Sequence, residues 1–183
     1  DNPLTVALAN LRGTVGGDLF IRENDGVLNK VDIVGPLSAG SHTIHLVGGQ
    51  FILAAADLID DNSRINVNGG TFDLGAWQDT VGGLTLTSGQ VTGGGPEPEN
   101  GRLTSATTVQ VESGTIGAKL AGSGGLNKTT SGTVTLTADN TYTGATTITA
   151  GVLSISKDSV VGTPPVSPTP NHLVSDGGTL RWT

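Results

Sequence analysis

Acidic side chains that could do chemistry lie close together in the first third of the chain. Asp57, Asp60 and Asp61 fall within five residues. Carboxylates at such spacing can serve acid–base catalysis or bind calcium. The same cluster is more typical of a solvated corner after a strand, and that is the interpretation we favour. We therefore expect no catalytic residue and no metal ligand here.

A second combination places Trp77 between Asp73 and Asp79. An exposed indole can stack on a sugar ring, so a carbohydrate-binding or carbohydrate-cleaving β-helix is the alternative function. Such a groove needs several aromatic residues, and the 183-residue chain has only 2 Trp, 1 Tyr and 3 Phe. We favour a corner position for Trp77, with surface glycans as possible partners.

Other familiar sites are missing from the sequence. His42 and His45 are three residues apart and fall on different strand faces, which does not favour a metal pair. The sequence contains no nucleophile elbow, phosphate-binding loop, zinc spacing or calcium nonapeptide, so no cofactor is expected. Residues 127–129 match a glycosylation sequon, which matters only in a host that modifies such sites.

Composition narrows the class of protein. The formal net charge is -7, with 16 acidic against 9 scattered basic residues, which argues against nucleic acid as a partner. The longest apolar run, residues 51–56, is far short of the ~20 residues that cross a membrane. With 29 Gly, 3% aromatic residues and no Met or Cys, a narrow aliphatic core between stacked short strands is indicated.

Short alternating segments predict the fold. Residues 124–156 hold three runs in which apolar residues alternate with Thr or Ser, a β-strand pattern. Three segments recur about a hundred residues apart and in the same order: 26–30 with 124–128, 38–53 with 142–155, and 68–74 with 176–182. Glycine-led strand starts recur every 18 to 21 residues. This spacing predicts an all-β solenoid of about eight or nine coils.

One domain, residues 1–183, is expected. Stretches rich in Gly and Pro at 93–101 and 162–170 should be loops thrown out from coil corners rather than linkers. Residues 4–8 and 18–22 are further strand candidates. Residues 50–61 are the best helix candidate, but for no more than a turn or two.

The strongest motif resembles a known family. Gly124–Lys128, Gly132–Leu136, Asn140–Gly144 and Thr147–Leu153 follow the order of the autotransporter-associated β-strand repeat, also called the passenger-associated transport repeat. The segments at 26–53 and 68–84 look like looser copies or connectors. The resemblance implies a right-handed parallel β-helix, secreted or displayed on a bacterial surface within a longer passenger, with no catalytic activity.

The motif also suggests individual roles. Asn140 is expected to bond its own backbone in a left-handed turn, and Tyr142 to cap a coil corner. Five apolar residues should point inward, namely Val134, Leu136, Ile148, Val152 and Ile155. The expected function is a non-enzymatic structural or adhesive surface protein. Because strand edges at coil ends attract other strands, self-association through those ends, as in a fibre, is also expected.

Overall fold

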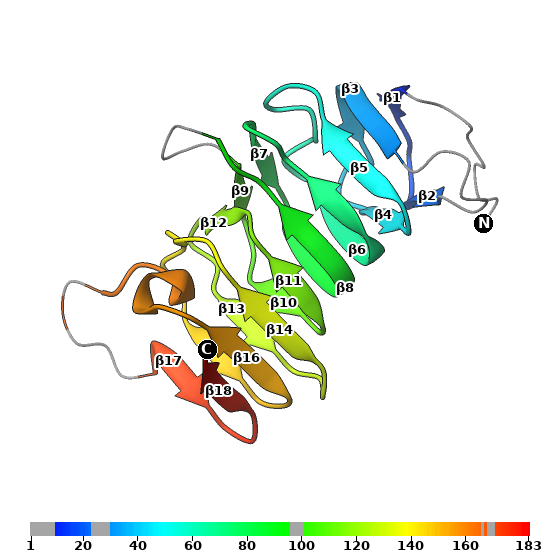
Figure 1. Cartoon of the computed structure of the whole chain (residues 1–183). Helices are drawn as coiled ribbons and strands as arrows, with labels where there is room; N and C mark the ends of the chain where they lie inside the picture. Colours follow the sequence, from blue (N-terminus) through cyan, green and yellow to red (C-terminus); the bar gives the residue numbers. More distant parts are fainter. Residues whose placement is uncertain (1–9, 23–29, 96–100, 166, 168–170) are drawn as a thin grey trace.

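The computed structural model describes residues 10–22, 30–95, 101–165, 167 and 171–183, and shows a parallel β-solenoid (Figure 1). The chain climbs from β1 at one end of the stack to β18 at the other, and its strands pair in parallel with those of neighbouring coils. The all-β solenoid expected from the sequence is confirmed. Within these described ranges, no helix is long and apolar enough to cross a membrane.

Three ladders of strands form the sides of the solenoid. The first ladder contains β1 (Asn10–Thr14), β3 (Lys30–Ser38), β5 (Gln50–Leu53), the second half of β6 (Arg64–Asp73), the second half of β8 (Gly83–Thr92), β11 (Gly114–Ile116), β14 (Thr133–Leu136), β16 (Val152–Ile155) and β18 (Thr179–Trp182). The second contains β2 (Leu19–Arg22), β4 (Thr43–Val47), the first halves of β6 and β8, β10 (Val109–Val111), β13 (Leu126–Lys128), β15 (Thr146–Ile148) and β17 (Leu173–Ser175). The third contains β7 (Gln78–Val81), β9 (Arg102–Ser105) and β12 (Lys119–Ala121).

The solenoid makes about six turns. On its third side, Leu37 pairs with Ile59, and β7, β9 and β12 pair with one another. Later coils are joined there by single backbone hydrogen bonds, from Thr141 N–H to Leu120 and from Thr163 N–H to Tyr142. The first coil is joined on this side too, where Gly13 pairs with Leu37 and Thr14 with Ser38. About six turns are fewer than the eight or nine coils expected from the repeat length.

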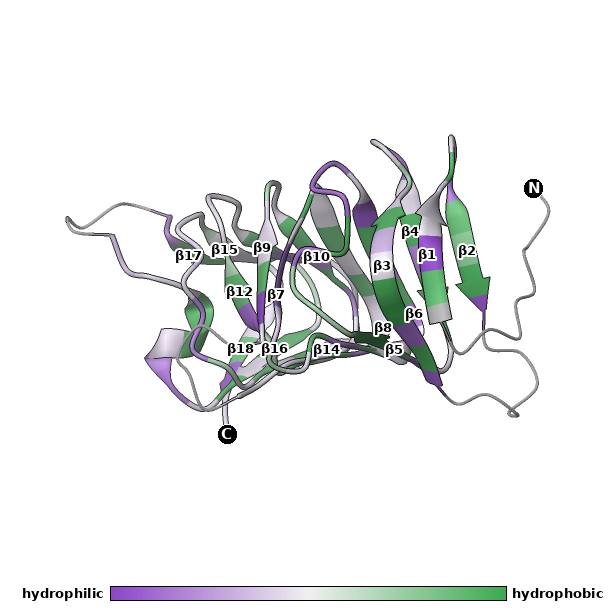
Figure 2. Cartoon of the chain, turned by 90° about the horizontal axis from the view of Figure 1, so that it is seen from above, coloured by the Kyte–Doolittle hydropathy of each residue, from purple (hydrophilic) through white to green (hydrophobic). Residues whose placement is uncertain are grey.

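Alternation along each strand fills the core. One buried column runs up the first ladder in register: Val31, Phe51, Phe72, Val91, Ile116 and Leu136. Figure 2 shows hydrophobic and hydrophilic residues alternating along the strands. Full burial of each such side chain stabilises the fold by roughly 1.5–3 kcal/mol. Because one coil exposes these residues on both sides, only stacking completes the core.

The internal repeat maps onto equivalent sides of the solenoid. β4 and β15 both lie in the second ladder, and β5 and β16 both lie in the first. The third match joins the second half of β6 to β18, again in the first ladder. The matched segments therefore occupy the same side in coils far apart along the stack.

Some local expectations were wrong or lie outside the described residues. Val152 pairs with outward-facing Thr133, and its neighbour Leu153 takes the inward position. Residues 50–61 hold strand β5 and turns rather than a helical turn; the one helical element described is the 3-10 helix η1 (Asp158–Val161). The strand candidate at 4–8, most of segment 26–30, and residues 96–100, 166 and 168–170 of the expected loops are outside the description.

One corner of the solenoid consists of glycines stacked directly on one another. A Cβ built on Gly70 would lie 2.1 Å from the Gly48 carbonyl oxygen, and one on Gly89 would lie 2.1 Å from that of Gly70. The next coil repeats the contact, with Gly114 against Gly89 at 2.2 Å. Backbone atoms line these contacts and cannot rotate away. The corner therefore tolerates no side chain.

We expect Gly89→Ala to destabilise the fold by more than about 2 kcal/mol. The residue has φ +94, where an L-residue costs roughly 1–2 kcal/mol, and the clash with Gly70 adds to that. Urea unfolding followed by tryptophan fluorescence would measure the loss. Gly16→Ala is the matched control, because nothing lies within 4 Å of its Cβ position. Equal stability of the two variants would contradict the stacked-corner explanation.

Candidate functional site

A groove on the third side brings together aromatic and polar side chains. Its volume is about 570 Å³, and its lining is Ala56, Asp57, Ala76, Trp77, Gln78, Asp79, Thr80, Arg102 and Thr104. β7 and β9 run side by side here, with Gln78 opposite Arg102. Trp77 comes directly before β7 and is 43% exposed. An exposed indole beside hydrogen-bonding groups can bind a ligand with both apolar and polar faces.

Asp79 lies beneath this groove rather than on the surface. It is 2% exposed, and its Oδ2 accepts hydrogen bonds from the backbone N–H groups of Leu58 (2.9 Å) and Ile59 (3.1 Å). Its Oδ1 has no hydrogen-bond partner among the described residues. Burial raises the pKa of Asp79 to about 6; the two backbone bonds oppose that rise, and the nearby Asp57 charge adds to it. Asp79 therefore links its own coil to the preceding coil through these two hydrogen bonds.

Asp57, Asp60 and Asp61 all line a second groove, of about 610 Å³, which shares Asp57 with the first. Asp60 accepts hydrogen bonds from Ser38 Oγ and from the backbone N–H of Asn62, both at 2.8 Å. These bonds, the backbone one first, lower the pKa of Asp60. Asp57 adopts φ 58 at a turn and lines the groove, whereas Asp61 is exposed. Within the described ranges, no three His, Cys, Asp or Glu residues are placed to hold a metal.

The Asp73–Trp77–Asp79 combination is separated by the fold. Asp73 accepts a bond from the backbone N–H of Gly75 at 2.9 Å and one from Gln50 Nε2 at 3.4 Å, so it holds the turn before Trp77. Asp79 points inward, as described above. Only Trp77 presents its side chain to solvent at the groove, where the sequence favoured a corner position.

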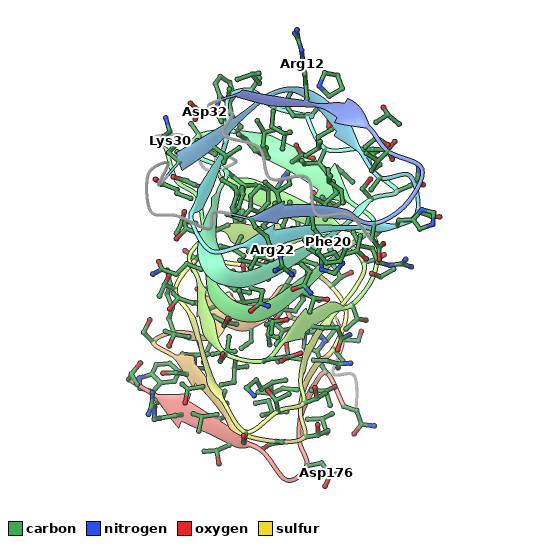
Figure 3. All side chains as sticks on the ribbon, turned by 90° about the vertical axis from the view of Figure 1, so that its right-hand side faces the viewer. Arg12, Phe20, Arg22, Lys30, Asp32 and Asp176 are labelled. Carbon is green, nitrogen blue, oxygen red and sulfur yellow. The ribbon has the colours of Figure 1, made fainter. Side chains whose placement is uncertain are left out.

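The two histidines serve different contacts. The Nδ1 atom of His42 lies 3.2 Å from the carbonyl oxygen of Ala39 in a local turn. His45 on β4 stacks on Phe20 of β2 with ring centroids 4.3 Å apart, and its Nε2 lies 3.9 Å from Asp18. Figure 3 labels Phe20 near the β1–β2 end of the stack, opposite the end that carries Asp176.

Asn140 and Tyr142 of the Asn-Thr-Tyr segment are buried inside the solenoid, which corrects two expectations. Asn140 is not in a left-handed turn; its Oδ1 accepts from the Leu120 backbone N–H (2.7 Å) and its Nδ2 donates to the Val160 carbonyl (2.5 Å). Tyr142 does not cap a corner, because it is 2% exposed and its hydroxyl bonds Thr146 Oγ1 at 2.7 Å. Burial raises the pKa of Tyr142 to about 12.

Lys128 is a buried residue that the sequence analysis did not single out. It occupies the core column between Val111 and Ile148, fully buried, with its ammonium donating to the carbonyl and hydroxyl oxygens of Thr130. Desolvation lowers its pKa, against the opposing charge of Glu112. The sequence did hold a signal for this burial. Lys128 lies two residues after the apolar Leu126, and residues two apart on a strand face the same side.

Comparisons with known proteins place the motif segment. The sequence model of the passenger-associated transport repeat matches residues 126–155. The Adhesin BmaC autotransporter of Brucella suis biovar 1 is 40% identical over 88 residues, which are 43% of this chain and 2% of that protein. No solved structure gives a significant match. The chain therefore carries a passenger-associated transport repeat, as the motif predicted.

Asp79→Asn should make the protein more stable relative to the natural chain as the pH rises. A carboxyl whose folded-state pKa is about 6, above the ordinary 3.8, contributes stability that is complete below pH 4 and lost as the pH passes 6. The loss for this buried group is on the order of 2–3 kcal/mol. Asparagine carries no charge to desolvate, so the difference between the two proteins should grow across that window. Urea unfolding at pH 4, 5, 6 and 7 would measure it.

Asp60→Asn is the control for that series. The pKa of Asp60 is lowered, so its carboxylate contributes stability above pH 4 that is lost as the pH falls further. Its difference curve should slope the opposite way. Parallel curves for the two variants would contradict this account of Asp79.

Asn140→Ala should destabilise the fold by about 2–4 kcal/mol, because it leaves a buried N–H and a buried carbonyl unpaired. Its neighbour Asp139 instead pairs with Lys157 at 2.8 Å in an exposed position. Exposed ion pairs contribute little, so Asp139→Ala should cost less than about 1 kcal/mol. Thermal unfolding of both variants would test the contrast, and an equal loss would argue against it.

Proposed function

We propose that the chain is a non-enzymatic structural stretch of a bacterial surface passenger, whose stacked coils hold surfaces at a distance outside the cell. The supporting observation is the place of the matched repeat. Residues 126–155 run from β13 to β16 and pair with the coils on both sides through the same two ladders. The repeat is thus a building unit of the solenoid.

The distribution of acids supports the non-enzymatic part of the proposal. Asp60 and Asp73 accept backbone hydrogen bonds within turns, while Asp79, inside the core, accepts a hydrogen bond from the preceding coil. Each of these three carboxylates thereby has a structural partner of its own. Asp57 and Asp79 line the same groove, but a catalytic pair would need two carboxylates that both face a substrate bond, and Asp79 is instead buried and bonded to the Leu58 and Ile59 N–H groups.

We further propose that the last coil joins another coil of the same kind. Leu180 pairs in register with buried Leu153, and Trp182 with buried Ile155. Both are therefore in core positions, yet they are 36% and 63% exposed. Stacking another rung on β18 would bury both side chains and pair the edge of the strand. A longer array of coils, or a second copy of the chain, supplies such a rung.

Leu180→Lys should abolish association of the isolated chain, because a charge would then lie in the joint. Sedimentation velocity and negative-stain electron microscopy over a concentration range would compare it with the natural chain. Val34→Lys is the control, since Val34 is 41% exposed on β3, away from the last coil. A natural chain that stays monomeric at every concentration would rule out a second copy as the partner, and unchanged association of Leu180→Lys would contradict the joint.

Location can be tested separately. Brief protease treatment of intact cells of the source bacterium should release peptides of this chain for mass spectrometry, while cytosolic marker proteins stay protected. Release only after cell lysis would contradict surface display.

A further inference from the structure

We propose that the groove beside Trp77 is a binding subsite for one neutral pyranose unit of an oligosaccharide. This goes beyond a scaffolding role and does not depend on the joint at the last coil. A volume of about 570 Å³ is ample for one sugar ring with its substituents, and the groove lies on a lateral side that coil stacking leaves open.

Trp77 provides a stacking platform whose backbone is held in place by the preceding turn. Its backbone N–H donates to the Leu74 carbonyl at 2.9 Å, and Asp73 holds the preceding Gly75 at 2.9 Å. The indole remains 43% exposed beside the groove. A pyranose presents a flat face of C–H groups, which packs on an aromatic ring, while its hydroxyls remain at the rim for polar contacts.

Polar groups in the groove supply both donors and acceptors. Arg102 Nη2 donates to Gln78 Oε1 at 2.5 Å, which fixes the side-chain amide so that its Nε2 group faces away from Arg102. Thr80 and Thr104 add hydroxyls, and Asp57 adds a carboxylate. This mixture matches sugar hydroxyls, each of which can donate and accept.

The charges in the groove select among sugars. Asp57 and Asp79 both line it, and the only described cation in the lining, Arg102, already donates to Gln78. A second carboxylate, as in a uronic acid, would add repulsion between like charges. We therefore expect neutral pyranoses to bind in preference to acidic ones.

The test uses the whole chain with four probes: cellotetraose, chitotetraose, β-1,4-galactotetraose and tetragalacturonate. Isothermal titration and saturation-transfer NMR should detect at least one neutral probe, with weaker or no binding of tetragalacturonate. Trp77→Ala should weaken that binding about fivefold to tenfold, in line with the loss of one aromatic contact. Trp182→Ala is the matched control, because it removes the other indole, at the far end of the solenoid.

Three results would overturn the proposal. They are no binding of any neutral probe, equal weakening in both tryptophan variants, and preference for tetragalacturonate. Circular dichroism of each variant would establish that it is folded. The sugar readouts do not measure self-association, and sedimentation velocity of Trp182→Ala would show separately any change at the joint, so failure of the sugar site and failure of the joint at Leu180 would be told apart.

Discussion

The structure depends on hydrogen bonding between backbones of successive coils. Most strands are short, down to three residues in β10 to β13, and find their partners only in the coils before and after them. Isolated strands of this length are not stable in water. Stability is therefore a property of neighbouring coils taken together, as in other repeat proteins.

Close stacking imposes a second condition at the corners. Where backbones approach within about 2 Å of a Cβ position, as at Gly70 and Gly89, only glycine fits. Elsewhere, a polar side chain directed into the solenoid replaces a missing backbone partner. Asp79 does this for Leu58 and Ile59, and Asn140 does it for Leu120 and Val160. The same stacking that forbids side chains at one corner thus requires buried polar ones at another.

The use of inward positions and coil ends for packing also explains where a ligand can bind. Inward positions are used by the core, and coil ends are joining surfaces in our proposal. Only lateral sides keep outward side chains available along the whole stack. The groove at Trp77 lies on such a side, where Gln78 and Arg102 from adjacent coils meet. A site of this kind combines residues from neighbouring coils, so a substitution in one coil changes a site shared with the next.

The sequence by itself determined the fold class, the coil repeat and the family of the motif at 126–155. Period-two alternation and recurrent glycines are local signals, and they survive in any stack of short strands. Most inward residues of the motif, such as Val134 and Leu136, followed from that alternation. The register at Val152 did not, because which of two adjacent apolar residues faces inward is set by the pairing of β16 with β14.

Only the tertiary structure decided what the polar residues do. Asp73 and Asp79 look alike around Trp77 in sequence, yet one holds a turn and the other is buried between coils. Lys128 and Asn140 resemble surface residues until their coils are stacked, when each meets a carbonyl from a turn or a neighbouring coil. Those partners lie up to twenty residues away along the chain, a distance set by the coil length. The physical reason is that stacking of the coils decides which polar side chains are buried and which groups they bond. A local sequence pattern does not show which residues of the neighbouring coil lie next to them.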